Sequence, residues 1–347
     1  MFFLENGRMT WPTNTAPTMN LKLFLWNAEN LFILFDQKPT GDITKLEEHQ
    51  WQKLSGSIYE NKPLKKILEL QKIILEKDPD IIMLCEVGGP ESLSNFNEHF
   101  LKGAYYTALV EGNSDRNIDI GFLVKKTLPF YFDLQSNKNR PINFNYAHAA
   151  MHENPPPSLK FSRDIVELKL FTSNRDNPFL ILLLGHLKSH LDPEKVDPRG
   201  FTRRKAEMRT LVEIHQELRQ NYPKTPQIVA GDFNGNASRH NTDEEFKIIY
   251  EKTQLEDVLE VVGIKPENRW TFCQVRQGGG KTDGKQLDYA FLTPELNDII
   301  KKDSTQVYRY RDEFGFEKDW PLTLDAKLEL PSDHYPIFFE LEKLPVW

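Results

Sequence analysis

The chain has 347 residues, a mass of 40.5 kDa and a formal net charge of −7. Hydrophobic residues make up 39% of it, which supplies a core and excludes an intrinsically disordered chain. The negative charge gives no general attraction to nucleic acid. No apolar run reaches the roughly 18 residues that a membrane span requires. The two cysteines, Cys85 and Cys273, lack the spacing of a disulfide framework or a zinc site.

We expect Met1–Asn20 to be a loose lead-in, because it lacks the charged-then-apolar order of a secretory signal. Without such a signal, the expected location is the cytoplasm. Residues 21–347 show no internal repeat and no low-complexity linker, so we expect them to form one domain.

Short apolar runs along the chain are typical of buried strands. They are Leu21–Asn30, Asp80–Glu86, Gly121–Val124, Ile165–Phe171, Phe179–Ser189, Gln227–Asn236, Gln286–Leu292 and the second half of Leu330–Leu341. Two segments, Pro63–Glu76 and Thr202–Leu218, have the apolar spacing of amphipathic helices. Some strands alternate with helices and others follow one another directly. This mixture predicts an α/β sandwich of two packed sheets with helices outside.

In the first helix the predicted inward face consists of Leu64, Ile67, Leu68, Ile74 and Leu75. In the second it consists of Met208, Leu211, Val212, His215 and Leu218. Three stretches rich in polar, Gly or Pro residues are expected to be loops: Asp36–Gln52, Asn137–Leu159 and Arg276–Gln286.

Polar residues that are able to bind metal gather at the ends of the predicted strands. Alternation along a strand places Asn27 and Glu29 on one face, and Glu86 ends another strand. Hard cations such as Mg²⁺ take oxygen ligands, usually one or two carboxylates with water and substrate phosphate. Taken singly, such an acid is more often a solvated strand end.

Two further groups carry possible acid–base chemistry. Asp232 and Asn234 share a face by the same alternation; the carboxylate can activate a water and the amide can stabilise an oxyanion. By itself, this segment is equally typical of a turn. In Ser332-Asp333-His334, the imidazole can be held in one tautomer by Asp288, although a surface histidine is as good an interpretation.

Other catalytic arrangements are disfavoured by missing residues. A serine-hydrolase triad lacks its GxSxG elbow. Gly280-Lys281-Thr282 lacks the first glycine of a P-loop, since position 275 is Val275. His186 and His190 lack the glutamate of a zinc-protease helix.

A cationic stretch follows the predicted strand that carries His186. It consists of Lys188, Lys195, Arg199, Arg203, Arg204, Lys205 and Arg209. A solvated helix face and a substrate-binding surface are about equally good interpretations of it.

The motifs NAEN, LCE, GHLKS, GDFN, LDY and SDH, in that order, resemble the endonuclease/exonuclease/phosphatase (deoxyribonuclease-like) superfamily. The resemblance covers about Leu21 to Leu341. It is greatest to bacterial nuclease-like members that open with N-x-E-N-L-F, here Asn27–Phe32. Each motif is weak alone, and the ordered set is specific.

The resemblance implies a four-layered αββα sandwich of two mixed sheets flanked by helices, with residues 21–347 as the catalytic domain. It also implies Mg²⁺- or Mn²⁺-dependent hydrolysis of phosphoesters. The implied metal residues are Asn27, Glu29, Glu86 and Asp333, and the implied catalytic residues are His186, Asp232, Asn234, Asp288 and His334. Asp119, Arg163 and Lys188 occupy positions typical of substrate-side residues, although loop-stabilising salt bridges explain the first two equally well.

We therefore expect a hydrolase of ester bonds, an endonuclease that cleaves DNA or RNA by in-line attack of water. One alternative is a phosphatase or phospholipase that acts on inositol phosphates or sphingomyelin. Another is a binding member of the fold without catalysis. The expected partner is nucleic acid or another phosphodiester, and no protein partner is inferred.

Overall fold

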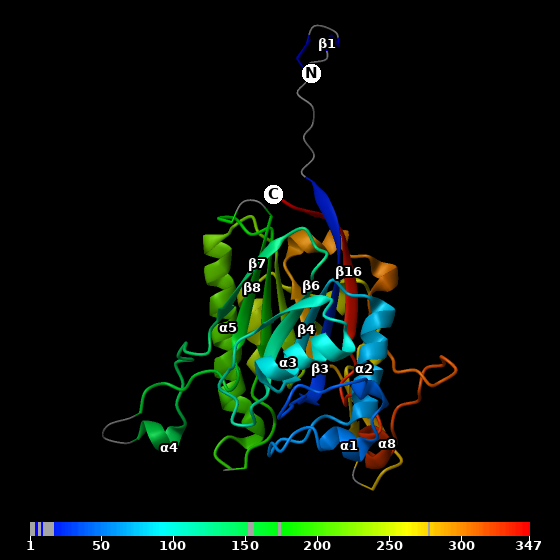
Figure 1. Ribbon diagram of the computed structural model, residues 1–347. Coiled ribbons are helices and arrows are strands. Elements are labelled where there is room, and N and C mark those ends of the chain that lie inside the picture. Colours follow the sequence, from blue (N-terminus) through cyan, green and yellow to red (C-terminus); the bar gives the residue numbers. More distant parts are fainter. Residues whose placement is uncertain are drawn as a thin grey trace.

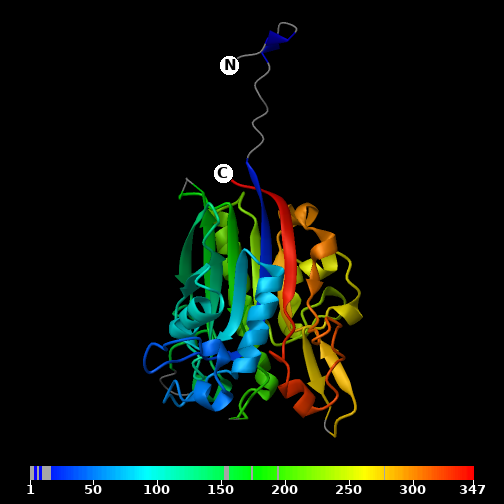
Figure 2. The same ribbon diagram turned by 45° about the vertical axis from the view of Figure 1, so that its right-hand side comes forward.

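The structure is a computed structural model that describes residues 4–5, 8–9, 17–151, 156–172, 175–193, 195–276 and 278–347. Within these residues, two six-stranded sheets pack face to face (Figures 1 and 2). The first sheet has the order β15 (Gln306–Val307), β16 (Ile337–Pro345), β3 (Thr18–Leu31), β4 (Ile81–Val87), β6 (Asp119–Lys125), β5 (Tyr105–Leu109). The second has the order β11 (Glu256–Asp257), β14 (Asp288–Leu292), β10 (Gln227–Asp232), β9 (Leu180–His186), β8 (Ile165–Phe171), β7 (Tyr131–Ser136).

Both sheets are mixed, because each contains one parallel pair among antiparallel neighbours. The parallel pairs are β3–β4 and β10–β9. Each pair requires a crossover, and the two predicted helices supply them. They are α2 (Leu64–Lys77) before β4 and α5 (Phe201–Asn221) before β10.

Helices cover the outer faces of both sheets, which confirms the predicted layered sandwich (Figure 1). Buried residues of α2 and α3 (Gly89–Phe100) belong to the same core cluster as the first sheet. Those of α5 form a second cluster with the outer face of the second sheet. The remaining described α-helices are short: α1 (Glu48–Gln52), α4 (Ala147–Ala150), α6 (Lys247–Lys252), α7 (Val258–Val261) and α8 (Leu324–Leu328). No described helix is long and apolar enough to cross a membrane.

Several local predictions were wrong. Leu75 of α2 is 53% exposed, and the inward face is instead completed by Leu70 and Ile73. The expected loops contain α1, the short α4 and the strand β13 (Thr282–Lys285), which pairs with β12 (Phe272–Val275). Most residues of that hairpin are only half-buried. Apolar and polar residues therefore do not need to alternate there, and no strand pattern marks it in the sequence. All five inward residues predicted for the second helix are buried.

The predicted lead-in, Met1–Asn20, lies mostly outside the described residues. Of its described parts, β1 (Leu4–Glu5) pairs with β2 (Arg8–Met9). The strand β3 begins at Thr18, where its pairing with Pro345 starts.

A buried carboxyl next to the second sheet makes folding stability depend on pH. Burial raises the pKa of Asp164 from 3.8 to about 6, against hydrogen bonds from Ser136 Oγ and Asn137 N–H. The native state therefore binds more protons than the unfolded state between these values, so stability falls as pH rises through that window.

We expect Asp164→Asn to remove this dependence, because an amide stays neutral. Between pH 4.5 and 7.5 the wild type should lose on the order of 1–2 kcal/mol more stability than the variant. Urea unfolding of both proteins at both pH values measures the difference. Parallel pH dependences would show that Asp164 ionises normally in the fold.

Candidate active site

Three of the predicted catalytic side chains form one row across the second sheet. Asp232 lies beside His186 on β9 and opposite Asp288 on β14 in the strand register. Alternation places them on the face of Leu184, Ala230 and Ala290, the face that packs against the first sheet. The row is therefore the polar end of the inter-sheet core.

The first sheet meets this row through Asn27. The amide Nδ2 of Asn27 donates to Asp232 Oδ2 over 2.9 Å, and both side chains are almost fully buried. On the other oxygen, Asp232 Oδ1 accepts the N–H of Asn234 over 2.9 Å. Residues 205 positions apart in the chain are thus joined directly.

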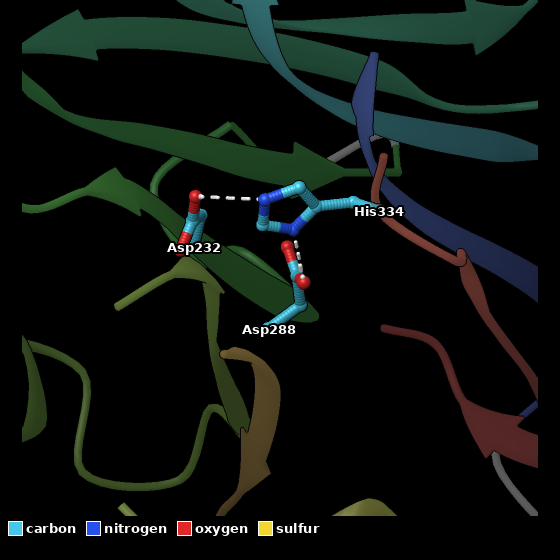
Figure 3. Close-up of side chains that lie close together, drawn as sticks. All are labelled: Asp232, Asp288 and His334. Atoms are coloured by element: carbon cyan, nitrogen blue, oxygen red, sulfur yellow. Dashed lines mark hydrogen bonds and ion pairs between the residues drawn. The ribbon is translucent and has the colours of Figure 1, made fainter. Parts of the chain in front are cut away.

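His334 completes the cluster from the segment before β16 (Figure 3). Its Nδ1 lies 2.7 Å from Asp288 Oδ2, and its Nε2 lies 3.9 Å from Asp232 Oδ2. A carboxylate only accepts hydrogen bonds, so Nδ1 carries the proton and Asp288 holds the imidazole in one orientation. Trp26 Nε1 donates to the His334 carbonyl over 2.9 Å and fixes the backbone.

Ser332 links His334 to the first sheet. Its hydroxyl donates to the Asn27 carbonyl over 2.7 Å and accepts the His334 N–H over 3.1 Å. The Ser332-Asp333-His334 segment therefore has its position set by β3, although the two lie at opposite ends of the chain.

Burial and charge make this cluster electrostatically unusual. Burial alone would lower the pKa of His334, but Asp288 and Asp232 raise it well above its ordinary value. Burial raises the pKa of Asp232, and the charge of His334 opposes that rise. Burial and Arg163 lower the pKa of His186 well below its ordinary value, so this imidazole is neutral. Strongly perturbed groups at strand ends are typical of catalytic sites.

Two buried atoms of the cluster have no hydrogen-bond partner among the described residues. They are Asp288 Oδ1 and His186 Nδ1. His186 Nε2 lies 3.6 Å from Asp232 Oδ2. Unpaired buried polar atoms are costly, and they are common where a site awaits a ligand.

The backbone is left-handed at several residues near the strand ends. Glu29, Asn30, Glu86 and Asn234 all have positive φ without being glycine. The β3–β4 and β4–β6 ladders shift register at these points, as bulges beside active sites do. Simple alternation, which we used to place Asn27 with Glu29 and Asp232 with Asn234, therefore does not apply at these ends.

Glu86 is the carboxylate on β4, the strand beside Asn27. Its Oε2 accepts the Asn30 N–H over 3.1 Å and lies 3.9 Å from Arg116 Nη2. Asp333 directly precedes His334. Its Oδ2 is 3.2 Å from Lys327 Nζ and its Oδ1 is 3.9 Å from His334 Nε2. Burial favours a higher pKa for Asp333, but His334 and Lys327 outweigh it and lower the pKa.

Glu29 is held by two lysines that we did not single out in the sequence. Its Oε2 lies 3.4 Å from Lys62 Nζ and 3.1 Å from Lys66 Nζ. Burial lowers the pKa of Lys62 to about 8, although the charge of Glu29 opposes this. In the sequence, Lys62 resembles any solvated lysine that precedes a helix. Only its burial in the structure distinguishes it.

The predicted substrate-side residues differ in their surroundings. Arg163 is buried, and its Nη1 approaches the Leu187 carbonyl at 3.4 Å, which also accepts from Asn234 Nδ2. No described carboxylate lies within ion-pair distance of Arg163. Asp119 Oδ1 instead accepts the Gly112 N–H over 2.7 Å and supports a loop. The Lys188 ammonium turns back to the Ser189 and Leu191 carbonyls.

Several solved structures have a similar fold. D. rerio TDP2, complexed with single strand DNA product, is 15% identical over 93% of this chain and 99% of that chain, with a TM-score of 0.55. The catalytic domain of human Nocturnin, with bound sulfate anion, is 16% identical over 93% and 94%, with a TM-score of 0.56. An endonuclease/exonuclease/phosphatase family protein from Bacteroides thetaiotaomicron is 15% identical over 94% and 96%, with a TM-score of 0.54.

The chain therefore has the fold of the endonuclease/exonuclease/phosphatase superfamily, which confirms the predicted resemblance at the level of the fold. No family model matches the sequence, and no curated protein matches it.

A glycine pair permits the close approach of β9 and β10 beside His186 and Asp232. Gly231 pairs with Gly185, has φ 144°, and a Cβ on it would lie 1.8 Å from the Gly185 carbonyl oxygen. We expect Gly231→Ala to cost at least about 2 kcal/mol, because backbone must move.

Gly41→Ala is the matched control, since Gly41 has φ 80° and nothing within 4 Å of its added Cβ. It should lose only about 1 kcal/mol, from backbone strain alone. Urea unfolding measures both losses. An equal loss in the two variants would contradict a steric requirement at Gly231.

Proposed function

We propose that the protein is a divalent-metal-dependent phosphodiester hydrolase that acts on nucleic acid. The observation that carries this proposal is the buried constellation of Asn27, Asp232, Asp288 and His334, built by two sheets at their meeting ends. A charged histidine and an aspartate with a raised pKa, 3.9 Å apart, are suited to moving a proton and stabilising an anion.

The residues around this constellation fit a hard cation. Glu86 and Asn27 offer oxygen donors from the neighbouring strands β4 and β3, and Asp333 offers another from the segment before β16. This is the ligand chemistry of Mg²⁺ or Mn²⁺. Among the described residues, Asp232, Asp288 and His334 form a titratable group whose ligand atoms all lie within 4.8 Å of one another. In that group the Asp288–His334 hydrogen bond already uses one atom of each. We therefore assign the cation to the Glu86 side.

Glu29 is the weakest member of the predicted ligand set. A cation would compete with Lys62 and Lys66 for its carboxylate. Glu29 lies near the metal in this arrangement, and its carboxylate holds these two lysines. A bound cation would polarise the phosphate and stabilise its developing charge.

The chain's own residues perform the remaining steps. Asp232 accepts a proton from the attacking water, whose oxygen forms a bond to phosphorus as the bond to the leaving ester oxygen breaks. His334, held by Asp288, donates a hydrogen bond to the phosphate. His186 and Asn234 contact phosphate oxygens, and Arg163 supplies a buried positive charge nearby.

Nucleic acid is favoured as the substrate by one comparison, the structure of D. rerio TDP2 with single strand DNA product. We assign internal cleavage of DNA or RNA strands. Asp119 and Lys188 remain predicted substrate-side residues. In this structure, their side chains form hydrogen bonds with the backbone of their own loops.

We expect Asp232→Asn and His334→Ala to lower the rate of hydrolysis of bis-p-nitrophenyl phosphate and plasmid DNA at least about 100-fold with Mg²⁺ or Mn²⁺. Asp303→Asn and His49→Ala, at exposed positions, are the matched controls. Release of p-nitrophenol and nicking of the plasmid measure the rates. Equal rates for wild type and both site variants would overturn the proposal. Release of inorganic phosphate from inositol phosphates, without cleavage of either ester, would favour the phosphatase.

Metal binding can be measured without catalysis. We expect Glu86→Gln to weaken Mn²⁺ binding roughly tenfold or more, because a carboxylate ligand becomes neutral. Glu91→Gln, at an exposed position in α3, is the control. Electron paramagnetic resonance of free Mn²⁺ reports the affinity. Unchanged affinity in Glu86→Gln would place the cation elsewhere.

A further inference from the structure

A pocket of about 500 Å³ adjoins the proposed active site, and none of the roles above uses it. Its wall includes Gly235, which follows Asn234, and Gln286 and Leu287, which precede Asp288. The chain thus leads directly from the catalytic row into this pocket. Other lining residues include His190, Arg199, Trp270 and Lys285.

Positive charge in this pocket is not fully compensated. Of the two lining carboxylates that face it, Glu260 is paired with Arg269 over 2.9 Å and Asp243 accepts the Asn236 N–H over 3.0 Å. Among the described residues, no carboxylate lies within ion-pair distance of Arg199 or Lys285. Lys285 Nζ donates to the side-chain oxygen of Gln274, which is neutral, so the charges of both cations remain available to an anion.

The cations also repel one another in the absence of an anion. Burial and then the charge of Arg199 lower the pKa of Lys285. Burial and the charges of Arg204, Arg199 and Lys285 lower the pKa of His190 to about 4. Such mutual repulsion is relieved by a bound anion, and it identifies the groups that would face it.

The backbone at Arg199 is strained. Arg199 has φ 61°, and the next residue, Gly200, is also left-handed, with room for no Cβ because the Ser189 carbonyl oxygen would lie 2.3 Å away. Buried Arg204 donates to the carbonyls of Lys188 and Arg199 over 2.9 and 3.0 Å. A non-glycine residue with a strained backbone, whose carbonyl is held by a buried arginine, is typical of a functional position.

Trp270 gives the pocket an apolar wall. Its ring packs directly on the backbone of Gly284, where a Cβ would lie 1.7 Å from the indole, and lies 5.4 Å from the ring of Trp320. A rigid aromatic beside two cations matches a phosphate that carries a sugar and a base.

We propose that this pocket binds the phosphate that neighbours the scissile phosphate on the same strand, through Arg199 and Lys285, with the attached nucleoside against Trp270. This inference rests on the proposed function. It deepens that function by selecting a substrate with two adjacent phosphates. It also divides the cationic stretch by role: Arg204 is structural, paired with Glu245 over 2.6 Å, and Arg199 faces the ligand.

The test uses nitrophenyl esters of thymidine in matched pairs. One pair is thymidine 5′-(p-nitrophenyl phosphate) with and without a 3′-phosphate, and the other is the 3′-ester with and without a 5′-phosphate. We expect the second phosphate to raise kcat/KM roughly tenfold in one pair, which identifies the side of the scissile bond that the pocket serves. In Arg199→Ala/Lys285→Ala this ratio should fall to about one.

Lys281→Ala is the matched control, because Lys281 is exposed on the same hairpin and outside the pocket. It should keep the wild-type ratio. A ratio of about one in the wild type, or an unchanged ratio in the double variant, would overturn the proposal.

Direct binding separates this proposal from the catalytic one. Calorimetry with thymidine 3′,5′-bisphosphate in EDTA requires no turnover, and we expect roughly tenfold weaker binding to the double variant than to wild type and Lys281→Ala. If no ester is hydrolysed but this difference is present, the pocket assignment stands and the proposed activity fails. Equal binding to all three proteins would remove the pocket assignment whatever the activity.

Discussion

The hydrogen bond between Asn27 and Asp232 is the contact on which the candidate site depends. It joins the polar ends of two sheets whose inner faces are otherwise apolar. Its geometry exists only because β3 and β10 lie face to face, with their ends at the same level. Asp232 then brings His186 and Asp288 with it by strand register, and Asn27 brings the His334 segment through Ser332.

Burial at this junction determines the chemistry. A carboxylate and an imidazole that are excluded from water act on one another far more strongly than surface groups do. Asp288 and Asp232 together keep His334 charged although burial opposes it. Only a few polar side chains carry the free-energy cost of removal from water. The apolar strands behind them make the arrangement rigid. The pocket beside the row has a different character. Arg199 and Lys285 have no ion-pair partner among the described residues, are at least partly solvated, and are suited to an anion that arrives from outside.

Much of the framework could be predicted from the sequence, because apolar runs and helical spacing are local properties. The strands β8 and β9 and the helices α2 and α5 lie within a few residues of their predicted bounds. The hairpin β12–β13 could not be predicted, since its half-buried residues show no alternation. The ordered motifs predicted a set of site residues, and the structure brings Asn27, Asp232, Asp288 and His334 of that set together. The placement of Glu29 was not predictable, because left-handed backbone at its position overrides strand alternation.

The sequence by itself determined the sandwich class, the strand-end clusters and the choice of Asp232, Asp288 and His334 as acid–base candidates. These follow from periodicity, residue chemistry and motif order along the chain. Only the tertiary structure decided how the charges pair: Glu29 with Lys62 and Lys66, Arg204 with Glu245, and Arg199 with no carboxylate among the described residues. The physical reason is that pairing and burial depend on distances between segments far apart in the chain, and no local pattern encodes those distances.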